Sequence, residues 1–314
     1  MLVEQTMRRR FSIVITCYNQ RSFIRAAVDS ALFQSLPSKE TIVVDDGSND
    51  GSLEILQEYG DSIHLVRVWP NQGAIAARNR GAAIAGGQYL VFLDGDDLLR
   101  AGALNVYERI VAQRSPKIIL GRTQWFEGHV PLIQDDSGAY EVVFAEYAAL
   151  MSKDRGYGLS ASSIVVDREV FQDAGGWSPG IFHLDCIDLC VKLGYSGRAV
   201  LICAPRTVFY RLHKGNSIHI VPPFLQMAHR IMDKERGGQY PGGRKHRFER
   251  YAWLGGVLAF WMKRGLRARL YRDAFKLVAA AWPMILAGVI RRSIVQLKGR
   301  RPLETIRLLR TEIR

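Results

Sequence analysis

Short apolar segments alternate with longer amphipathic segments through the first hundred residues of the chain. Residues 11–16, 41–46, 63–68 and 88–94 (FSIVIT, TIVVDD, IHLVRV and QYLVFLD) are rich in β-branched and other apolar residues, as buried strands are. The segments between them, residues 20–34, 50–59 and 74–85, have the apolar spacing of helices. Strands that alternate with helices predict an α/β fold with a mostly parallel central sheet and helices on both faces.

Polar side chains follow the first, second and fourth of these predicted strands. They are Tyr18 and Asn19, then Asp45 and Asp46, then Asp94, Asp96 and Asp97. Right-handed crossovers place the carboxyl ends of parallel strands at one edge of the sheet, where such folds bind ligands. Carboxylates held together repel one another unless a cation lies between them, and oxygen ligands suit Mg²⁺ or Mn²⁺. No glycine-rich phosphate loop follows the first strand, so we expect the metal to hold a substrate diphosphate.

Five motifs carry a resemblance to a known family. In order, they are IVITCYN, IVVDDGSNDGS, NQGAIAARNRGAAIAGGQYLVFLDGDD, REVFQDAGGWSP and YRLHKGNS. As a set they resemble glycosyltransferase family 2, inverting enzymes with the Rossmann-like GT-A fold that use nucleotide sugars, over roughly residues 10–217. The resemblance implies transfer of a sugar from a nucleoside diphosphate, a UDP-sugar in many relatives, to a hydroxyl of a saccharide or lipid-linked acceptor. Such transfer would serve cell-surface polysaccharide or glycolipid synthesis.

The same resemblance implies roles for the residues that contact the nucleotide. Tyr18 and Asn19 would border the nucleotide, and Asp45 or Asp46 would read the edge of uracil. Arg78 would meet the base or the phosphates. From the residues alone, Asp46 can instead turn the chain and cap the helix that follows, and Arg78 can be a solvated helix charge.

A second set of implied roles concerns the sugar diphosphate. Asp94 would meet the ribose, Asp96 would bind the metal on the diphosphate, and His213 would complete the metal shell. The alternatives are that His213 is a structural or surface histidine and that Asp97 caps the helix after it.

The general base is the point at which the chain departs from its relatives. Asp185 and Cys186 stand where the family usually has Glu and Asp, and Asp188 follows three positions later. Asp185 is the first candidate base and Asp188 the second, with a simple helix N-cap as the alternative for Asp185. Because the acidic pair is altered, a catalytically inactive sugar-nucleotide-binding scaffold or sensor is the alternative function.

Charge divides the chain near its last quarter. Residues 244–314 contain 18 Lys and Arg against 4 Asp and Glu, a net charge of +14, whereas residues 1–243 have a net charge of −1. We therefore predict a glycosyltransferase domain at residues 1–217 and a basic, amphipathic helical region at residues 218–314. Nucleic acid would also suit this charge, but the tryptophans among the apolar runs favour an anionic membrane surface, so no nucleic acid is expected.

The cellular location follows from the same features. The N-terminus has no uninterrupted apolar stretch, and the four cysteines form no CxxC pair, so we expect a cytoplasmic protein, peripheral on the inner face of the cell membrane. The apolar run from Leu277 to Ile290 contains Pro283 and is shorter than the roughly 20 residues that span a bilayer. It is therefore expected to lie in the membrane interface.

Overall fold

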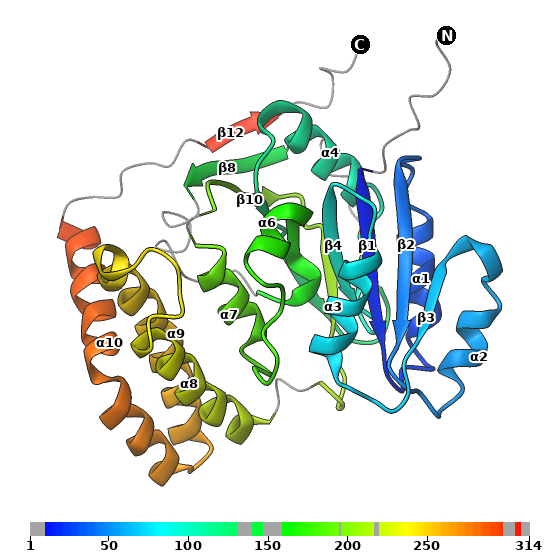
Figure 1. Cartoon of the computed structure of the whole chain (residues 1–314). Coiled ribbons are helices and arrows are strands. Elements are labelled where there is room, and N and C mark those ends of the chain that lie inside the picture. Colours follow the sequence, from blue (N-terminus) through cyan, green and yellow to red (C-terminus); the bar gives the residue numbers. More distant parts are fainter. Residues whose placement is uncertain are drawn as a thin grey trace.

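A nine-stranded sheet forms the centre of the computed structural model, which describes residues 10–130, 140–146, 159–194, 196–216, 220–297 and 305–308 (Figure 1). The strand order is β12-β8-β10-β6-β9-β4-β1-β2-β3. The strands are β1 (Phe11–Cys17), β2 (Lys39–Asp45), β3 (His64–Arg67), β4 (Tyr89–Asp94), β6 (Ile118–Leu120), β8 (Tyr140–Glu146), β9 (Ile164–Asp167), β10 (Arg198–Ala204) and β12 (Thr305–Leu308). Strands β8 and β9 run opposite to the other seven, so the sheet is mostly parallel, as predicted.

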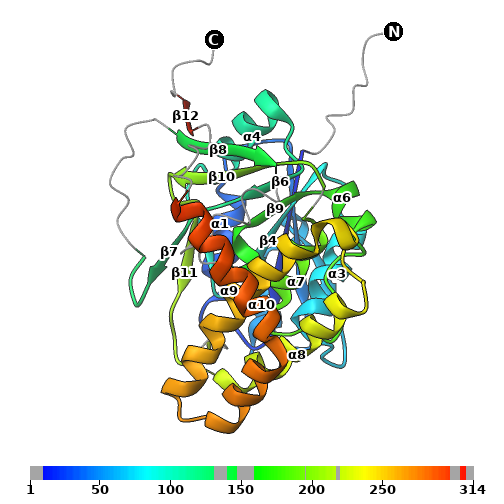
Figure 2. The same ribbon diagram turned by 90° about the vertical axis from the view of Figure 1, so that its left-hand side faces the viewer.

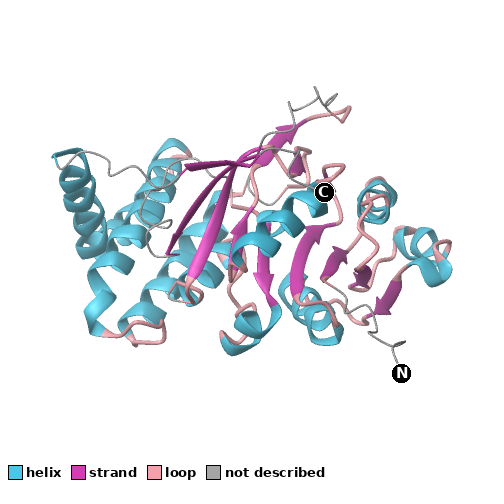
Figure 3. Ribbon diagram, turned by 90° about the horizontal axis from the view of Figure 1, so that it is seen from above, coloured by secondary structure: helices cyan, strands magenta, loops and turns pink. Residues whose placement is uncertain are grey.

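Two layers of helices cover the sheet, which Figure 3 shows from above. Helices α1 (Ile24–Leu32), α2 (Ser52–Gln57) and α4 (Ala103–Arg114) pack with Ile13 and Ile15 of β1 in one apolar cluster. Helices α3 (Ala74–Ile84), α6 (Arg168–Asp173) and α7 (Asp185–Lys192) pack with Val14 in the other. Successive residues of a strand point to opposite faces, which places Val14 opposite its neighbours. The predicted alternation of strands and helices is confirmed.

A second, three-stranded sheet adjoins the central one. It contains β5 (Leu98–Leu99), β11 (Val208–Arg211) and β7 (Thr123–Phe126), with β11 in the middle. Strand β5 follows β4 after a turn of three residues, and β11 pairs with it in the antiparallel sense. The pairing therefore brings the chain after β11 close to the end of β4.

Three helices follow the predicted boundary at residue 217, and Figure 2 shows them in front of the sheet. They are α8 (Val221–Arg236), α9 (Arg247–Arg267) and α10 (Tyr271–Leu297). Helices α9 and α10 approach closely at Gly255, where an added Cβ would lie 1.9 Å from the Met284 carbonyl oxygen. Residues of α7, α8 and α9 belong to one apolar cluster, so the core continues across residue 217.

The region after residue 217 differs from the prediction in two respects. It contains a strand, β12, which pairs with β8 and forms one edge of the sheet. Pro283 lies inside α10, and the helix continues past it although a proline removes one backbone hydrogen bond and crowds the preceding turn. The apolar part of α10 therefore runs for 21 residues, Tyr271–Arg291, with a mean hydropathy of 1.6. By length and composition alone, it is one helix of the described chain that is long enough to cross a membrane.

Candidate functional site

The carboxyl ends of β1, β2 and β4 are level with one another at one edge of the sheet. Cys17 lies opposite Asp45, and Thr16 lies opposite Asp94. Several hydrogen bonds join the loops after β1 and β2. Asn19 makes two of them: its N–H donates to Ser48 Oγ at 3.0 Å, and its Oδ1 accepts from the Asn49 N–H at 2.9 Å. Asn19 is thus used for the loop contact, and its left-handed φ of 53° is one that asparagine tolerates.

Tyr18, Asp45 and Asp46 differ in their exposure and in the hydrogen-bonding atoms that remain available to a ligand. Tyr18 is 48% exposed at the rim of the strand ends. Asp46 is fully used, since its two oxygens accept from the Gln72 and Gly73 N–H groups at 3.0 and 2.6 Å. Asp45 accepts from Ser48 N–H with Oδ1, while its buried Oδ2 has no partner in the described structure. Of the two aspartates, Asp45 therefore has the hydrogen-bonding capacity to read a base.

The alternative role for Asp46, a helix cap, is wrong. Helix α2 has Gly51 at its N-cap position, and Asp50 Oδ1 accepts from the Ser52 N–H at 3.0 Å. Asp46 instead fixes the loop that leads into α3, the helix that carries Arg78.

Arg78 joins two carboxylates that lie far apart in the sequence. Its Nη2 donates to Asp94 Oδ1 at 2.7 Å, and its Nη1 donates to Asp185 Oδ2 at 2.6 Å. The guanidinium lies 5.0 Å from the centre of the Trp177 ring, and the residue is 7% exposed. A solvated helix charge is therefore excluded. Both terminal nitrogens donate to carboxylates, so Arg78 is not positioned in this structure to contact a base or a phosphate.

The electrostatics of this trio follow from its burial. Burial acts to lower the pKa of the Arg78 guanidinium, but Asp94 and Asp185 outweigh that effect and raise the pKa. Two carboxylates and one guanidinium give the trio a net charge of −1. Asp185 Oδ1 has no hydrogen bond to a described residue, so one oxygen of this carboxylate is available to another group.

Asp96 and His213 meet at the end of β4. Asp96 Oδ2 lies 2.9 Å from His213 Nε2, and the Phe23 ring lies 4.7 Å from the imidazole. Burial raises the pKa of Asp96, the negative charge of Asp94 adds to this rise, and His213 opposes it. Two ligands about 2.1 Å from an octahedral cation lie about 3 Å apart, so the separation of these atoms fits adjacent positions on Mg²⁺ or Mn²⁺.

The imidazole requires one adjustment before it can bind a metal. The Gly215 N–H donates to His213 Nδ1 at 3.1 Å, which assigns the ring proton to Nε2, facing Asp96. Coordination through Nε2 needs that proton on Nδ1, and the bond from Gly215 would then be lost. In the part of the chain that the structure describes, no group of three or more His, Cys, Asp or Glu side chains surrounds a metal site. The substrate and water would supply the other ligands.

Asp97 is a buried structural residue and caps no helix. Its Oδ1 accepts from the Arg211 N–H at 3.1 Å, and its Oδ2 accepts from Ser162 Oγ at 2.6 Å. Burial, with Asp96 and Asp94, raises the pKa of Asp97 well above its usual range. Helix α4 begins later, with Gly102 at its N-cap position. The expected capping role is therefore wrong, and Asp97 ties β11, and hence His213, to the end of β4.

Asp185 and Asp188 lie on α7 but point to different surroundings. Helix α7 begins at Asp185 with Leu184 at the N-cap position and no side-chain cap, so the N-cap alternative for Asp185 is wrong. Asp188 is 0% exposed and accepts hydrogen bonds from Lys234 and Tyr240. The structure does not bring Asp188 to the strand ends, because α8 covers that side of α7. Burial, followed by the charge of Asp185, raises the pKa of the Cys186 thiol well above its usual range.

Sequence reasoning missed Ser162, Arg211 and Lys234. Arg211 stood inside the motif YRLHKGNS, and its Nε also donates to the Asp96 carbonyl oxygen at 3.1 Å. Ser162 and Lys234 carry no local signal, since their partners Asp97 and Asp188 are distant in the sequence.

Two solved structures have a similar fold. TarS from S. aureus in complex with UDP-GlcNAc superimposes with a TM-score of 0.69 at 16% identity, covering 88% of this chain and 81% of that chain. The mannosyltransferase PcManGT from Pyrobaculum calidifontis, in complex with GDP-Man and Mn²⁺, gives a TM-score of 0.57 at 17% identity, covering 94% and 89%. The fold is therefore that of the GT-A glycosyltransferases.

The family follows from the sequence comparisons. The model of Glycosyl transferase family 2 matches residues 12–173, more than half of the chain, which therefore belongs to this family. The putative teichuronic acid biosynthesis glycosyltransferase TuaG of Bacillus subtilis (strain 168) is 40% identical over 107 residues, 33% of this chain and 42% of that protein. The chain spans less than half the length of the curated relatives it matches. The predicted family and fold class are confirmed.

Proposed function

We propose that the chain transfers a sugar from a nucleoside diphosphate to an acceptor hydroxyl, with inversion at the anomeric carbon. One observation carries the proposal: Arg78 joins Asp94, at a strand end where donors bind in such folds, to Asp185, which has one carboxylate oxygen without a hydrogen bond to any described residue. A donor-binding residue and a candidate base are thus held within one hydrogen-bonded group. The nucleotide sugars in the complexes of TarS and PcManGT support this class of donor.

The donor would lie across the ends of β1, β2 and β4. Asp45 would accept a hydrogen bond from the base through Oδ2, with Tyr18 and Asn19 at the rim. Asp94 would meet the ribose with the oxygen that Arg78 does not use. UDP is the proposed carrier, by family resemblance and by the UDP-GlcNAc in the TarS complex.

Asp96 and His213 would hold a divalent cation, Mn²⁺ or Mg²⁺. The separation of 2.9 Å between their ligand atoms supports this assignment, as does the Mn²⁺ in the complex of PcManGT. When bound, such a cation neutralises the charge that develops on a leaving diphosphate. Asp97 would keep His213 in place through β11, and Phe23 would limit the tilt of the imidazole.

Asp185 is the proposed general base. Its free Oδ1 would take the proton of the acceptor hydroxyl while the hydroxyl oxygen attacks the anomeric carbon. The bond from that carbon to the diphosphate oxygen breaks in the same displacement, and the nucleoside diphosphate leaves. A single displacement inverts the anomeric configuration and needs no covalent enzyme intermediate. Arg78 would hold the carboxylate in its reactive orientation.

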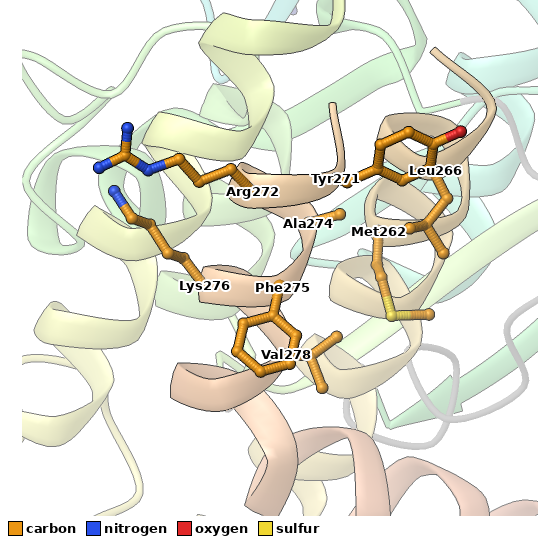
Figure 4. A pocket seen from close by; sticks show the side chains of 8 residues that line it. All are labelled: Met262, Leu266, Tyr271, Arg272, Ala274, Phe275, Lys276 and Val278. Atoms are coloured by element: carbon orange, nitrogen blue, oxygen red, sulfur yellow. The ribbon is translucent and has the colours of Figure 1, made fainter. Parts of the chain in front are cut away.

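The C-terminal region is proposed to bind the inner face of the cell membrane. Phe275 and Trp282 of α10 are 74% and 60% exposed. A cavity of about 720 Å³ lies at the turn between α9 and α10, walled mainly by apolar side chains, and Figure 4 shows Arg272 and Lys276 side by side at its edge. Residues 262–276 carry six Lys and Arg and one Asp. Exposed aromatic and basic residues together suit an anionic lipid surface.

The acceptor is proposed to be a saccharide or a lipid-linked saccharide. The α9–α10 turn lies at the same end of the molecule as the carboxyl ends of β1 and β2, the lower end in Figure 1. A membrane bound at this turn would therefore be on the side of the donor site. The name of TuaG, a putative teichuronic acid biosynthesis glycosyltransferase, supports a role in cell-surface glycan synthesis.

A thermal-shift screen of nucleotide sugars, with and without Mn²⁺, tests the proposal. A ligand that binds only the folded chain raises its midpoint, so the donor should give a metal-dependent shift. Product formation from the labelled donor and a membrane extract then separates an enzyme from the alternative, an inactive scaffold or sensor. Binding without turnover would favour the scaffold, for which the Cys186 position is the supporting observation.

A further inference from the structure

The segment of residues 177–192, which includes α7 and the proposed base Asp185, is attached to α3 at its beginning. Asn79 Nδ2 donates to the Trp177 carbonyl oxygen at 2.8 Å, and the Trp177 N–H donates to Asn79 Oδ1 at 2.9 Å. Trp177 is fully buried, and Arg78 lies over its ring. This end of the segment is therefore fixed to the half of the molecule that would bind the donor.

The rest of the segment is attached to α8, beyond the predicted domain boundary. Arg230 Nη1 donates to the Gly180 carbonyl oxygen at 2.8 Å, and the Phe224 ring lies 4.8 Å from the His183 ring. Lys234 Nζ donates to Ser178 Oγ at 2.9 Å and also to Asp188 Oδ1. Helix α8 thus contacts the segment before α7 and α7 itself.

Asp188 is the centre of a buried polar group that extends into the C-terminal region. Tyr240 donates its O–H to Asp188 Oδ1 at 2.6 Å, and the side chain of Asp188 is 1% exposed. Burial, with the charge of Asp188, raises the pKa of Tyr240, so the phenol stays protonated and remains a donor. A buried carboxylate needs such partners, because an unpaired buried charge is costly.

Helix α9 stabilises this buried polar group through contacts with α8 and with the loop that carries Tyr240. Arg250 forms a buried ion pair with Glu235 of α8, with Nε at 2.6 Å from Oε2. The same guanidinium donates to the Pro241 and Gly243 carbonyl oxygens at 2.7 and 3.0 Å. The loop that carries Tyr240 is therefore held to both α8 and α9.

We propose that Lys234 and Tyr240 are positioning residues for the base. Asp185 and Asp188 are one turn apart on α7, so the ion pair of Asp188 with Lys234 and the ion pair of Asp185 with Arg78 fix the helix from two sides. The C-terminal region then belongs to the machinery of transfer as well as to membrane binding. This inference rests on the proposed function, in which Asp185 is the base.

The test compares Lys234→Met and Tyr240→Phe with wild type in the full chain. We expect both variants to keep the affinity for UDP-sugar and Mn²⁺ within about twofold and to lose turnover at saturating substrates, roughly 10- to 100-fold for Lys234→Met, because small displacements of a catalytic group cost this much. Lys245→Met, at an exposed lysine in the same region, is the matched control and should behave as wild type. If Lys234→Met does not fold, Tyr240→Phe, which removes a single hydroxyl, decides the question.

A second measurement separates positioning from a general loss of structure. If Lys234 acts through Asp185, Lys234→Met should cause no further loss of turnover in an Asp185→Asn background. Unchanged turnover in both single variants, or an equal further loss in that background, would overturn the inference. Failure of the proposed function is distinguishable, because it would show as wild-type turnover of Asp185→Asn alone.

Discussion

Replacing Asp185 with Asn tests the proposed base with little disturbance of the fold. The substitution changes the net charge of the buried trio of Asp94, Arg78 and Asp185 from −1 to zero. The amide oxygen of Asn can still accept the hydrogen bond from Arg78 Nη1. The bond weakens by about 1 kcal/mol, since a charged acceptor is roughly twice as strong as a neutral one, and the loss of repulsion with Asp94 offsets part of this. We therefore expect the melting temperature to change by only a few degrees.

Catalysis should respond far more strongly than stability. An amide cannot take the proton of the acceptor hydroxyl, and loss of a general base costs on the order of 100- to 10,000-fold in rate. The assay is turnover at saturating donor and acceptor, with donor affinity measured separately by calorimetry. Asp233→Asn is the matched control, because that side chain is 73% exposed on α8. Turnover of Asp185→Asn within twofold of wild type would show that the base lies elsewhere.

Replacing Arg78, unlike replacing Asp185, should lower the stability of the chain. Arg78→Met leaves Asp94 and Asp185 without their shared cation, and breaking such a buried pair costs about 3–5 kcal/mol. We expect this variant to lose stability as well as activity. A stable, inactive Asp185→Asn beside an unstable Arg78→Met would distinguish a catalytic carboxylate from one that only balances charge.

Three further predictions follow from the structure. Chelation of divalent metal, or Asp96→Asn, should abolish donor binding in calorimetry without unfolding, and full activity in chelator would exclude the metal. Metal affinity should fall as the pH is lowered, because protons compete with the metal for Asp96, whose pKa is raised by burial and by Asp94. Phe275→Ser with Trp282→Ser should weaken binding to anionic vesicles by roughly tenfold or more per side chain, because each buries an apolar group, and unchanged binding would exclude this face. Gly81→Ala should lower the free energy of unfolding by about 1–3 kcal/mol, since its Cβ would lie 2.4 Å from Val14 Cγ1, and an unchanged denaturation midpoint would contradict this packing.

Truncation is a poorer test of membrane binding than these point substitutions. Removal of residues from 244 onward would delete α9 and α10. In the structure, Trp253 and Trp261 belong to the same apolar cluster as α7, and Arg250 pairs with buried Glu235. A truncated chain would lose part of its core, so release from vesicles would not isolate the membrane contact.

The elements of the fold could be predicted because their signals are local. Apolar runs such as residues 11–16 specify strands, and the level ends of β1, β2 and β4 follow from parallel pairing. The length of α10 was not predicted, because its apolar run, Leu277–Ile290, is only the central part of a helix that continues at both ends through charged residues. A short apolar run is therefore a poor measure of helix length.

The partners of the charged residues could not be predicted, because each partner is distant in the sequence. The spacing of Asp185 and Asp188 correctly places both near one another on a helix, but only the position of α8 shows that Asp188 is covered. Asp97 precedes a helix-like sequence, as a cap would, yet Gly102 intervenes and the carboxylate turns inward to Ser162. The local sequence pattern indicates that a carboxylate has a role, but it does not identify the residue that the carboxylate contacts.

The three carboxylates at the end of β4 contact different groups, and we therefore infer different roles for them. Asp94 forms an ion pair with Arg78, which it shares with Asp185, and Asp97 accepts two hydrogen bonds from neutral donors. Asp96 is paired with His213 and has no ion pair with an Arg or Lys side chain among the described residues. Burial and Asp94 raise the pKa of Asp96, so the protein stabilises its negative charge poorly, as it does that of Asp97. A diphosphate would add further negative charge to the same place. We therefore infer that donor and cation bind together here, each providing charge that the other needs.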